Sequence, residues 1–146
     1  MTTSSSLQIF ENLHELLHMF RTRTRSHLEA SHPELTLNEA RVLLHTARHP
    51  GITQKDVIER SHTDKAQMTR ILSSLETQGW LTRTPSTADK RVRHLHLSPA
   101  GKQLVTQLQA VQQQVADELL GDWPEALRMQ LLHTLQSAAH GTRPSE

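Results

Sequence analysis

The sequence predicts a mainly α-helical fold with one small β-hairpin, an α+β arrangement of the winged helix-turn-helix type. Three observations carry this prediction. A short helical segment is followed by a turn and a second helix, two short strands come directly after that helix, and long amphipathic segments flank the unit on both sides. The length of 146 residues fits one domain.

Two helices are expected before the turn. Apolar residues at helical spacing predict the first over residues 7–29, and Pro33 stops it because proline cannot continue a helix and disfavours helical geometry at the residue before it. Thr36 and Glu39 have the spacing of a capping box, which predicts a second helix over 37–48. The turn residues "HPG" at 49–51 end it.

The next segment has the pattern of a helix-turn-helix. Thr53 and Asp56 predict the start of a short third helix in "QKDVIERS", and Asp64 is the expected N-cap of a fourth, "KAQMTRILSSLETQ". The apolar side chains of this fourth helix share one face: Met68, Ile71, Leu72 and Leu75. Gly79 stands where a left-handed helix terminator is favoured.

A hairpin and two further helices follow. "WLTRT" and "RHLHLS" alternate like short strands and are joined by the polar stretch "PSTADKRV". Ser98 and Pro99 predict the start of a fifth helix, and "GDWP" at 121–124 separates it from a sixth. Both C-terminal helices carry apolar residues at steps of three and four.

The net charge of +1 hides an uneven distribution. Residues 64–93 contain six cations and three acids, whereas residues 111–146 contain two cations and five acids. A recognition helix followed by a basic hairpin is suited to duplex DNA, because the helix enters the major groove and the hairpin tip reaches the minor groove or the phosphates. The alternative interpretation is ordinary surface scatter of charge.

The stretch "MTRILSSLETQGWLTRTPSTADKRVRHLHLSPAGKQL" resembles the central segment of the MarR family of bacterial transcription regulators. The residues that carry the resemblance are Thr69-Arg70, Leu75-Glu76, Gly79, Arg83, Asp89-Lys90-Arg91, Leu97-Ser98 and Gly101. The order of the predicted helices also fits this family, so the resemblance covers nearly the whole chain.

The resemblance implies a homodimeric, sequence-specific DNA-binding regulator, in most cases a repressor. A small, often aromatic and anionic effector would release it from a pseudo-palindromic operator. It implies a single domain over 1–146, with a winged-helix lobe at 36–97 and a helical dimerisation region formed by 1–32 and 98–146. The sequence itself also favours a dimer, because the apolar stripes of the first, fifth and sixth predicted helices lack a partner within one small lobe.

The expected DNA-binding residues lie off the apolar stripe of the recognition helix and on the hairpin: Lys65, Ala66, Gln67, Thr69, Arg70, Ser73, Arg83, Asp89, Lys90, Arg91 and Arg93. Arginine suits a guanine edge and glutamine an adenine edge. The resemblance assigns the groove contact to Arg91 and the orientation of its guanidinium to Asp89, which is otherwise a plain turn former. The sequence leaves two roles open for Arg83, a phosphate contact or a brace at the base of the hairpin.

Helix faces also predict an effector crevice between the first and second helices, lined by His14, His18, Arg21, Arg41 and His45. The chain has eleven histidines, several of them in pairs four residues apart, which leaves a metal-responsive repressor as the alternative. We expect neither a metal site nor a cofactor.

Other classes of protein are disfavoured. The sequence has no glycine-rich phosphate loop, nucleophile elbow or close carboxylate pair, so we do not expect an enzyme. A winged helix that binds protein or RNA remains an alternative, although 3% aromatic content with no tyrosine leaves little for base stacking. Because the chain shows neither a signal sequence nor a long apolar run, we expect a cytoplasmic protein with no membrane partner.

Overall fold

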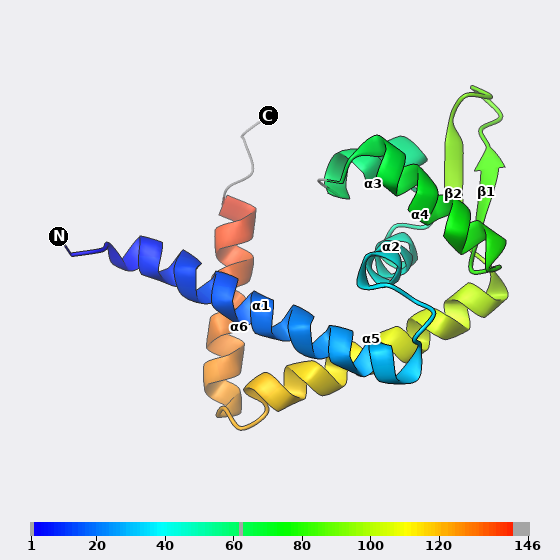
Figure 1. Cartoon of the computed structure of the whole chain (residues 1–146). Coiled ribbons are helices and arrows are strands. Elements are labelled where there is room, and N and C mark those ends of the chain that lie inside the picture. The colour runs from blue at the N-terminus through cyan, green and yellow to red at the C-terminus, as the bar shows by residue number, and fades with distance from the viewer. Residues whose placement is uncertain (1, 62, 142–146) are drawn as a thin grey trace.

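The computed structural model describes residues 2–61 and 63–141, and its architecture confirms the predicted fold class (Figure 1). The described elements are α1 (Ser5–Ser31), α2 (Leu37–Arg48), α3 (Gln54–Ser61), α4 (Lys65–Thr77), β1 (Leu81–Pro85), β2 (Arg93–Leu97), α5 (Pro99–Leu120) and α6 (Glu125–Gly141). Both ends of the domain predicted over 1–146 lie outside the described residues.

The predicted local signals form where they were expected. Thr36 accepts a hydrogen bond from the Glu39 backbone N–H at 3.1 Å, and the Glu39 carboxylate accepts from the Thr36 N–H at 3.3 Å, which completes the capping box of α2. Asp64 accepts from the Gln67 N–H at 3.0 Å at the start of α4. Gly79, after α4, has a φ of +82°, a conformation that favours glycine because it has no Cβ.

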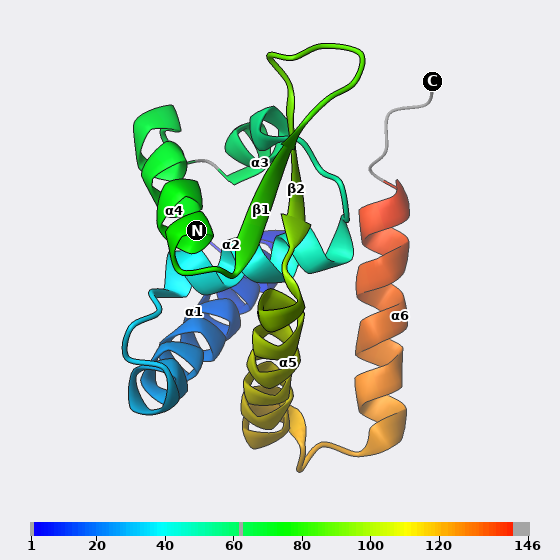
Figure 2. The same cartoon turned by 90° about the vertical axis from the view of Figure 1, so that its right-hand side faces the viewer.

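The winged lobe is built around a single apolar core. Four of its leucine side chains are fully buried: Leu43 of α2, Leu72 and Leu75 of α4, and Leu95 of β2. The antiparallel register pairs Leu81 with Leu97 and Pro85 with Arg93, so Leu81 and Leu95 point into this core. Burial of one such side chain stabilises the fold by about 1.5–3 kcal/mol. The core therefore holds α4 and the hairpin in a fixed relation (Figure 2).

A close backbone approach joins the hairpin to α5. At Gly101 a side chain would bring its Cβ to 2.0 Å from the Trp80 carbonyl oxygen, so only glycine fits here. The Ser98 N–H donates to that same carbonyl at 3.1 Å. The start of α5 is thus attached to the residue that precedes β1.

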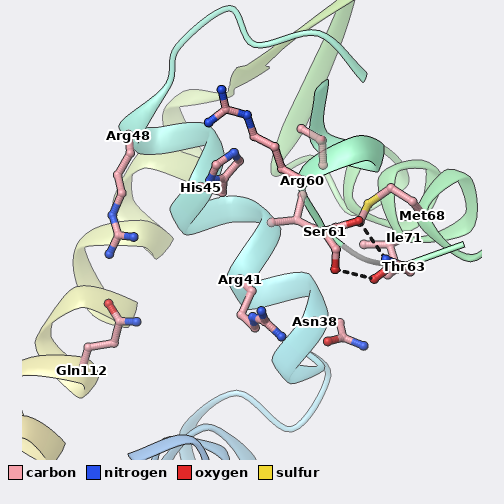
Figure 3. A pocket seen from close by; sticks show the side chains of 12 residues that line it. Asn38, Arg41, His45, Arg48, Arg60, Ser61, Thr63, Met68, Ile71 and Gln112 are labelled. Atoms are coloured by element: carbon pink, nitrogen blue, oxygen red, sulfur yellow. Dashed lines mark hydrogen bonds between the residues drawn. The ribbon is translucent and has the colours of Figure 1, made fainter. Parts of the chain in front are cut away.

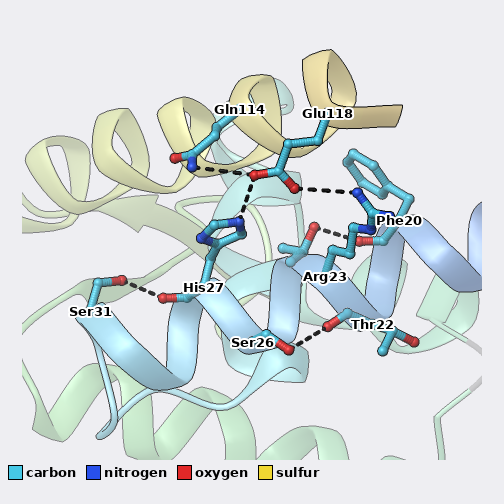
Figure 4. A network of polar contacts seen from close by, with 9 residues as sticks. Phe20, Thr22, Arg23, Ser26, His27, Ser31, Gln114 and Glu118 are labelled. Atoms are coloured by element: carbon cyan, nitrogen blue, oxygen red, sulfur yellow. Dashed lines mark hydrogen bonds and ion pairs between the residues drawn. The ribbon is translucent and has the colours of Figure 1, made fainter. Parts of the chain in front are cut away.

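The second half of α1 packs against α5, and a polar cluster joins them (Figure 4). Glu118 of α5 lies 3.1 Å from His27 Nε2 and 3.6 Å from Arg23 Nη1. Leu28 of α1 and Leu108 of α5 belong to the buried core. This packing places the two helices across the base of the lobe.

The first half of α1 and the whole of α6 carry apolar side chains that the chain itself does not cover. Phe10 is 70% exposed, and none of the residues of α6 is buried. Figure 2 shows α6 standing apart from the winged lobe. No described helix combines the length and apolarity needed to cross a membrane.

Candidate functional site

The outer face of α4 presents most of the residues that the sequence predicts for base contacts. Lys65, Ala66, Gln67 and Arg70 are exposed. Thr69 is half-buried, and its hydroxyl donates to the Lys65 carbonyl oxygen at 2.7 Å. Met68 and Leu72 on the opposite face are buried in the core. The core packing of α4 therefore turns its polar face outward, beside the hairpin.

In the structure, Arg83 makes the contacts of a brace at the base of the hairpin, one of the two roles that the sequence leaves open. Its Nε donates to Glu76 Oε2 at 3.1 Å, and its Nη2 donates to Glu76 Oε1 at 3.3 Å. The same guanidinium donates to Gln54 Oε1 and to Ser73 Oγ, each at 3.3 Å. Its side chain is 21% exposed. Arg83 thus braces β1 against α3 and α4, and its donors are used within the lobe.

The brace also engages Ser73 and Glu76. Ser73, predicted to face DNA, is half-buried and accepts a hydrogen bond from Arg83. The hydrogen bonds from Arg83 hold the pKa of the Glu76 carboxyl below its ordinary value. Arg83 and Glu76 therefore form an ion pair at neutral pH, and the charge of Arg83 is largely neutralised within the protein.

The cations at the hairpin tip, unlike Arg83, are exposed to solvent. The Arg91 side chain is 93% exposed, and its Nε lies 3.6 Å from Asp89 Oδ1. The same Asp89 oxygen accepts from the Arg91 backbone N–H at 2.9 Å. Asp89 therefore acts both as a turn former and as a neighbour of the guanidinium. Lys90 and Arg93 are also exposed, so the tip presents three cations to solvent.

A cavity of about 270 Å³ lies on the other side of α4, between α2, α3 and α4 (Figure 3). Four basic side chains line it: Arg41, His45 and Arg48 from α2, and Arg60 from α3. The remaining described residues that line it are Asn38, Val42, Val57, Ser61, Thr63, Met68, Ile71 and Gln112, and none of these carries a carboxylate.

His45 has an unusual environment in this cavity. Its Nε2 is buried and has no hydrogen-bond partner. Burial lowers the pKa of His45, and the positive charges of His49, Arg60 and Arg48 lower it further. The imidazole is therefore neutral at pH 7. A buried polar atom without a partner is costly in free energy, and an incoming ligand would relieve that cost.

The structure brings together only part of the effector crevice predicted from helix faces. Arg41 and His45 line the cavity, whereas His14, His18 and Arg21 are exposed on α1 and do not line it. Sequence reasoning missed Arg48 and Arg60. The spacing of Arg41, His45 and Arg48 along one face of α2 indicates Arg48 in retrospect. Arg60, on α3, joins them only because the fold brings α3 to the same cavity.

The histidine pairs do not assemble into a metal site. The rings of His45 and His49 lie with their centroids 4.7 Å apart. His94 Nδ1 lies 2.8 Å from the Gly51 carbonyl oxygen, so that ring is engaged by the backbone. Within the part of the chain that the structure describes, no group of three or more candidate metal ligands exists. The metal-responsive alternative thus receives no support.

Comparison with known proteins gives the family. A family model described as the MarR family matches residues 34–92, the segment that holds the helix-turn-helix and the hairpin tip. The transcriptional regulator HosA of Escherichia coli O157:H7 is 30% identical over 108 residues, which cover 74% of this chain and 79% of HosA. The chain belongs to the MarR family. As a MarR-family protein it is a DNA-binding transcriptional regulator and not an enzyme.

Solved structures agree on the fold of this MarR-family chain. A crystal structure of MarR superposes with a TM-score of 0.80 at 23% identity and covers 97% of this chain and 95% of that chain. Bordetella bronchiseptica BpsR, whose DNA binding is regulated by 6-hydroxynicotinic acid, superposes with a TM-score of 0.73 at 19% identity. That match covers 95% of this chain and 98% of BpsR.

Proposed function

We propose that this MarR-family regulator binds a pseudo-palindromic operator as a homodimer and represses transcription until a small anionic effector releases it. The observation that carries the proposal is the exposure of cations on one side of the lobe. Lys65 and Arg70 on α4 and Arg91 at the hairpin tip are all free to contact DNA.

Each element has its own part in DNA binding. Gln67 and Arg70 contact base edges in the major groove, where a good bidentate pair discriminates by roughly 1–3 kcal/mol. Lys65, Lys90 and Arg93 contact phosphates, which positions the lobe without reading sequence. Arg91 enters the minor groove, where the negative potential favours an arginine. Residues 36–97 form the DNA-binding lobe in this proposal.

The dimer forms through the helical region of residues 1–32 and 98–146. Ten large apolar side chains are exposed on the described chain: Leu7, Ile9, Phe10, Leu17, Met19, Trp123, Leu127, Met129, Leu132 and Leu135. All ten lie on α1, on α6 or between α5 and α6. Apolar patches of this kind mark protein–protein contact, and a second copy of the same chain covers them by two-fold symmetry.

Small-molecule release is supported by the basic cavity and by the likeness to BpsR, which responds to 6-hydroxynicotinic acid. An anion held by Arg41 and His45 gives the regulator a second site, distinct from its DNA-binding face. A ligand that changes DNA affinity must bind the two states of the regulator with different affinity.

Selection of duplexes from a random library by the purified protein tests this proposal. We expect the enriched sequences to form an inverted repeat whose half-sites lie about 10 base pairs apart, as a two-fold dimer requires. Enrichment of a single unrepeated site would contradict the dimeric mode. Failure to enrich any sequence would contradict sequence-specific recognition.

A further inference from the structure

His45 of α2 is a titratable side chain whose surroundings suit only its neutral form. Its Nε2 is buried without a hydrogen-bond partner, and its ring centroid lies 4.7 Å from that of His49. A neutral imidazole in this position leaves one hydrogen bond unmade. In a protonated imidazole both ring nitrogens carry N–H groups, so the buried Nε2 would be a charged donor without an acceptor. Protonation of His45 is therefore incompatible with the packing seen here.

The charged groups that share a cavity with this ring all have the same sign. Arg41 and Arg48 extend from α2 itself, and Arg60 lines the cavity from α3 (Figure 3). Among the described residues, none of these three arginines forms an ion pair. The described residues that α4 and α5 contribute to the lining are uncharged. A proton on His45 would thus add a fourth positive charge to a cluster that has no counter-ion.

The carboxylate of Asp56 lies outside this cluster. Asp56 of α3 is exposed and lines a neighbouring hollow together with His49 and Arg60. Within the part of the chain that the structure describes, it forms no ion pair. It does not line the cavity that holds His45, so it does not compensate a charge on the buried imidazole. The positive form of His49 adds to the repulsion on that ring.

Helix α3 is the element that can respond to this repulsion, because little of it is buried. Of its eight residues, all of them described, Val57 alone is buried. Gln54 at its start accepts a hydrogen bond from Arg83 of β1 at 3.3 Å. Its last residue, Ser61, is followed closely by Asp64, the N-cap of α4. A displacement of α3 therefore disturbs both the brace of the wing and the start of the recognition helix.

We propose that His45 is a pH switch: its protonation in mild acid drives Arg60 and α3 away from α2, opens the cavity to water and weakens operator binding. The switch goes beyond the proposed function, because a proton from solvent is its only signal, and it rests on that function for its effect on DNA.

The direction of the switch follows from linkage. In the closed arrangement, burial and the positive neighbours hold the pKa of His45 below its ordinary value. In an opened arrangement the ring is hydrated and lies farther from Arg60, so it takes up a proton at a higher pH. Acid therefore favours the opened arrangement, and the full effect is reached once the pH is below the pKa of the closed form.

This effect has the opposite sign to that of histidines elsewhere on the lobe. His94 and His96 belong to β2, and a proton on either adds positive charge to the wing. Added positive charge strengthens binding to the phosphate backbone. Without the switch, DNA affinity should therefore stay constant or rise in acid. A fall in affinity that depends on His45 distinguishes the switch from general electrostatics.

Fluorescence anisotropy with the selected duplex, from about pH 7.5 to about pH 5.5 at constant ionic strength, tests the proposal. We expect the affinity of the wild type to fall about fivefold or more over this range. His45→Gln, which is neutral and of similar size, should keep or gain affinity. Arg60→Gln removes part of the repulsion, so it should bind like the wild type at the higher pH and lose less affinity in acid. His133→Gln, at an exposed position of α6, is the matched control and should follow the wild type.

Two results in this titration would overturn the proposal. One is a wild-type affinity that stays constant or rises in acid. The other is an equal fall in the wild type and in His45→Gln. Thermal melts at both ends of the pH range verify that each variant is folded, so that a loss of affinity reports the switch and not unfolding.

A distance measurement without DNA tests the movement of α3 by itself. The chain has no cysteine, so Lys55→Cys on α3 and Gln103→Cys on α5, both exposed, give a specific pair of spin-label sites. Labelled chains diluted with unlabelled ones report the distance within one chain. We expect this distance to change between the two pH values, and to stay constant when His45→Gln is added.

The two measurements separate failure of the switch from failure of the proposed function. An unchanged distance in the wild type would overturn the displacement of α3, whatever the DNA affinity does. If no duplex binds at any pH while the distance changes only in chains that keep His45, the proposed function is wrong and the switch stands.

Discussion

Arg83 of β1 and Glu76 of α4 are joined by two hydrogen bonds, at 3.1 and 3.3 Å, that connect the wing to the recognition helix. We therefore predict that Arg83 supports DNA binding indirectly, by holding the wing in place against the recognition helix α4. Arg83→Gln and Glu76→Gln should both weaken operator binding, while the dependence of affinity on salt keeps its wild-type slope. A lost phosphate contact would instead make the slope of log K against log salt shallower by about 0.9. Anisotropy titrations over a salt series separate the two outcomes, with Lys55→Gln on the exposed face of α3 as the control.

Arg91 should make the largest contribution of the wing to DNA affinity. Arg91→Ala removes a freely exposed guanidinium and is expected to weaken operator binding tenfold or more, since one good groove contact is worth roughly 1–3 kcal/mol. Asp89→Asn, which keeps the turn hydrogen bond to the Arg91 N–H, should cost less. Competition titrations with a labelled duplex measure both. Wild-type affinity in Arg91→Ala would argue for a winged helix that binds protein.

The exposed apolar face of α6 should determine oligomeric state. Leu135→Glu places a charge among side chains that we propose to be buried between two copies, so it should yield monomers in sedimentation velocity at micromolar concentration. Gln130→Glu adds the same charge to the polar side of α6 and should leave the dimer intact. Equal sedimentation of the two variants would show that α6 does not form the interface.

His45 should make the fold sensitive to mild acid. Because burial lowers its pKa, the unfolded chain takes up a proton at this position before the native chain does. Above the ordinary histidine pKa, His45 is neutral in both the native and the unfolded chain and does not reduce stability. As the pH falls below that value, protonation of the unfolded chain lowers the free energy of unfolding. Thermal melts from about pH 7.5 to about pH 5.5 should show a smaller fall of Tm in His45→Gln than in the wild type. His133→Gln, an exposed position on α6, should behave like the wild type.

The order of the elements was predictable because their signals are local, but α1 runs from Ser5 to Ser31 and not over 7–29, since the serines at its ends carry no apolar signal. Thr36 and Glu39 of the capping box are only three positions apart. Gly79, after α4, is indicated by the positive φ that a helix terminator requires. The exposed face of α4 was predictable for the same reason, because the apolar stripe of a helix identifies its opposite face.

The role of Arg83 and the position of the cavity were not predictable, because both depend on contacts between distant segments. The guanidinium of Arg83 meets Gln54, 29 residues earlier in the chain. The cavity needs Arg60 of α3 to face Arg41 and His45 of α2. No spacing within one helix encodes that contact, and the same holds for the hydrogen bond from Arg83 to Ser73.

Fluorescence anisotropy tests most directly whether α4 and the wing read duplex DNA. The wild-type protein is titrated against the selected duplex and against a scrambled duplex of the same composition, over a range of salt concentrations. We predict that two chains bind each selected duplex at least about 10³-fold more tightly than the scrambled one, with affinity that falls steeply as salt rises. Equal affinity for the two duplexes would contradict sequence-specific recognition by this face of the lobe.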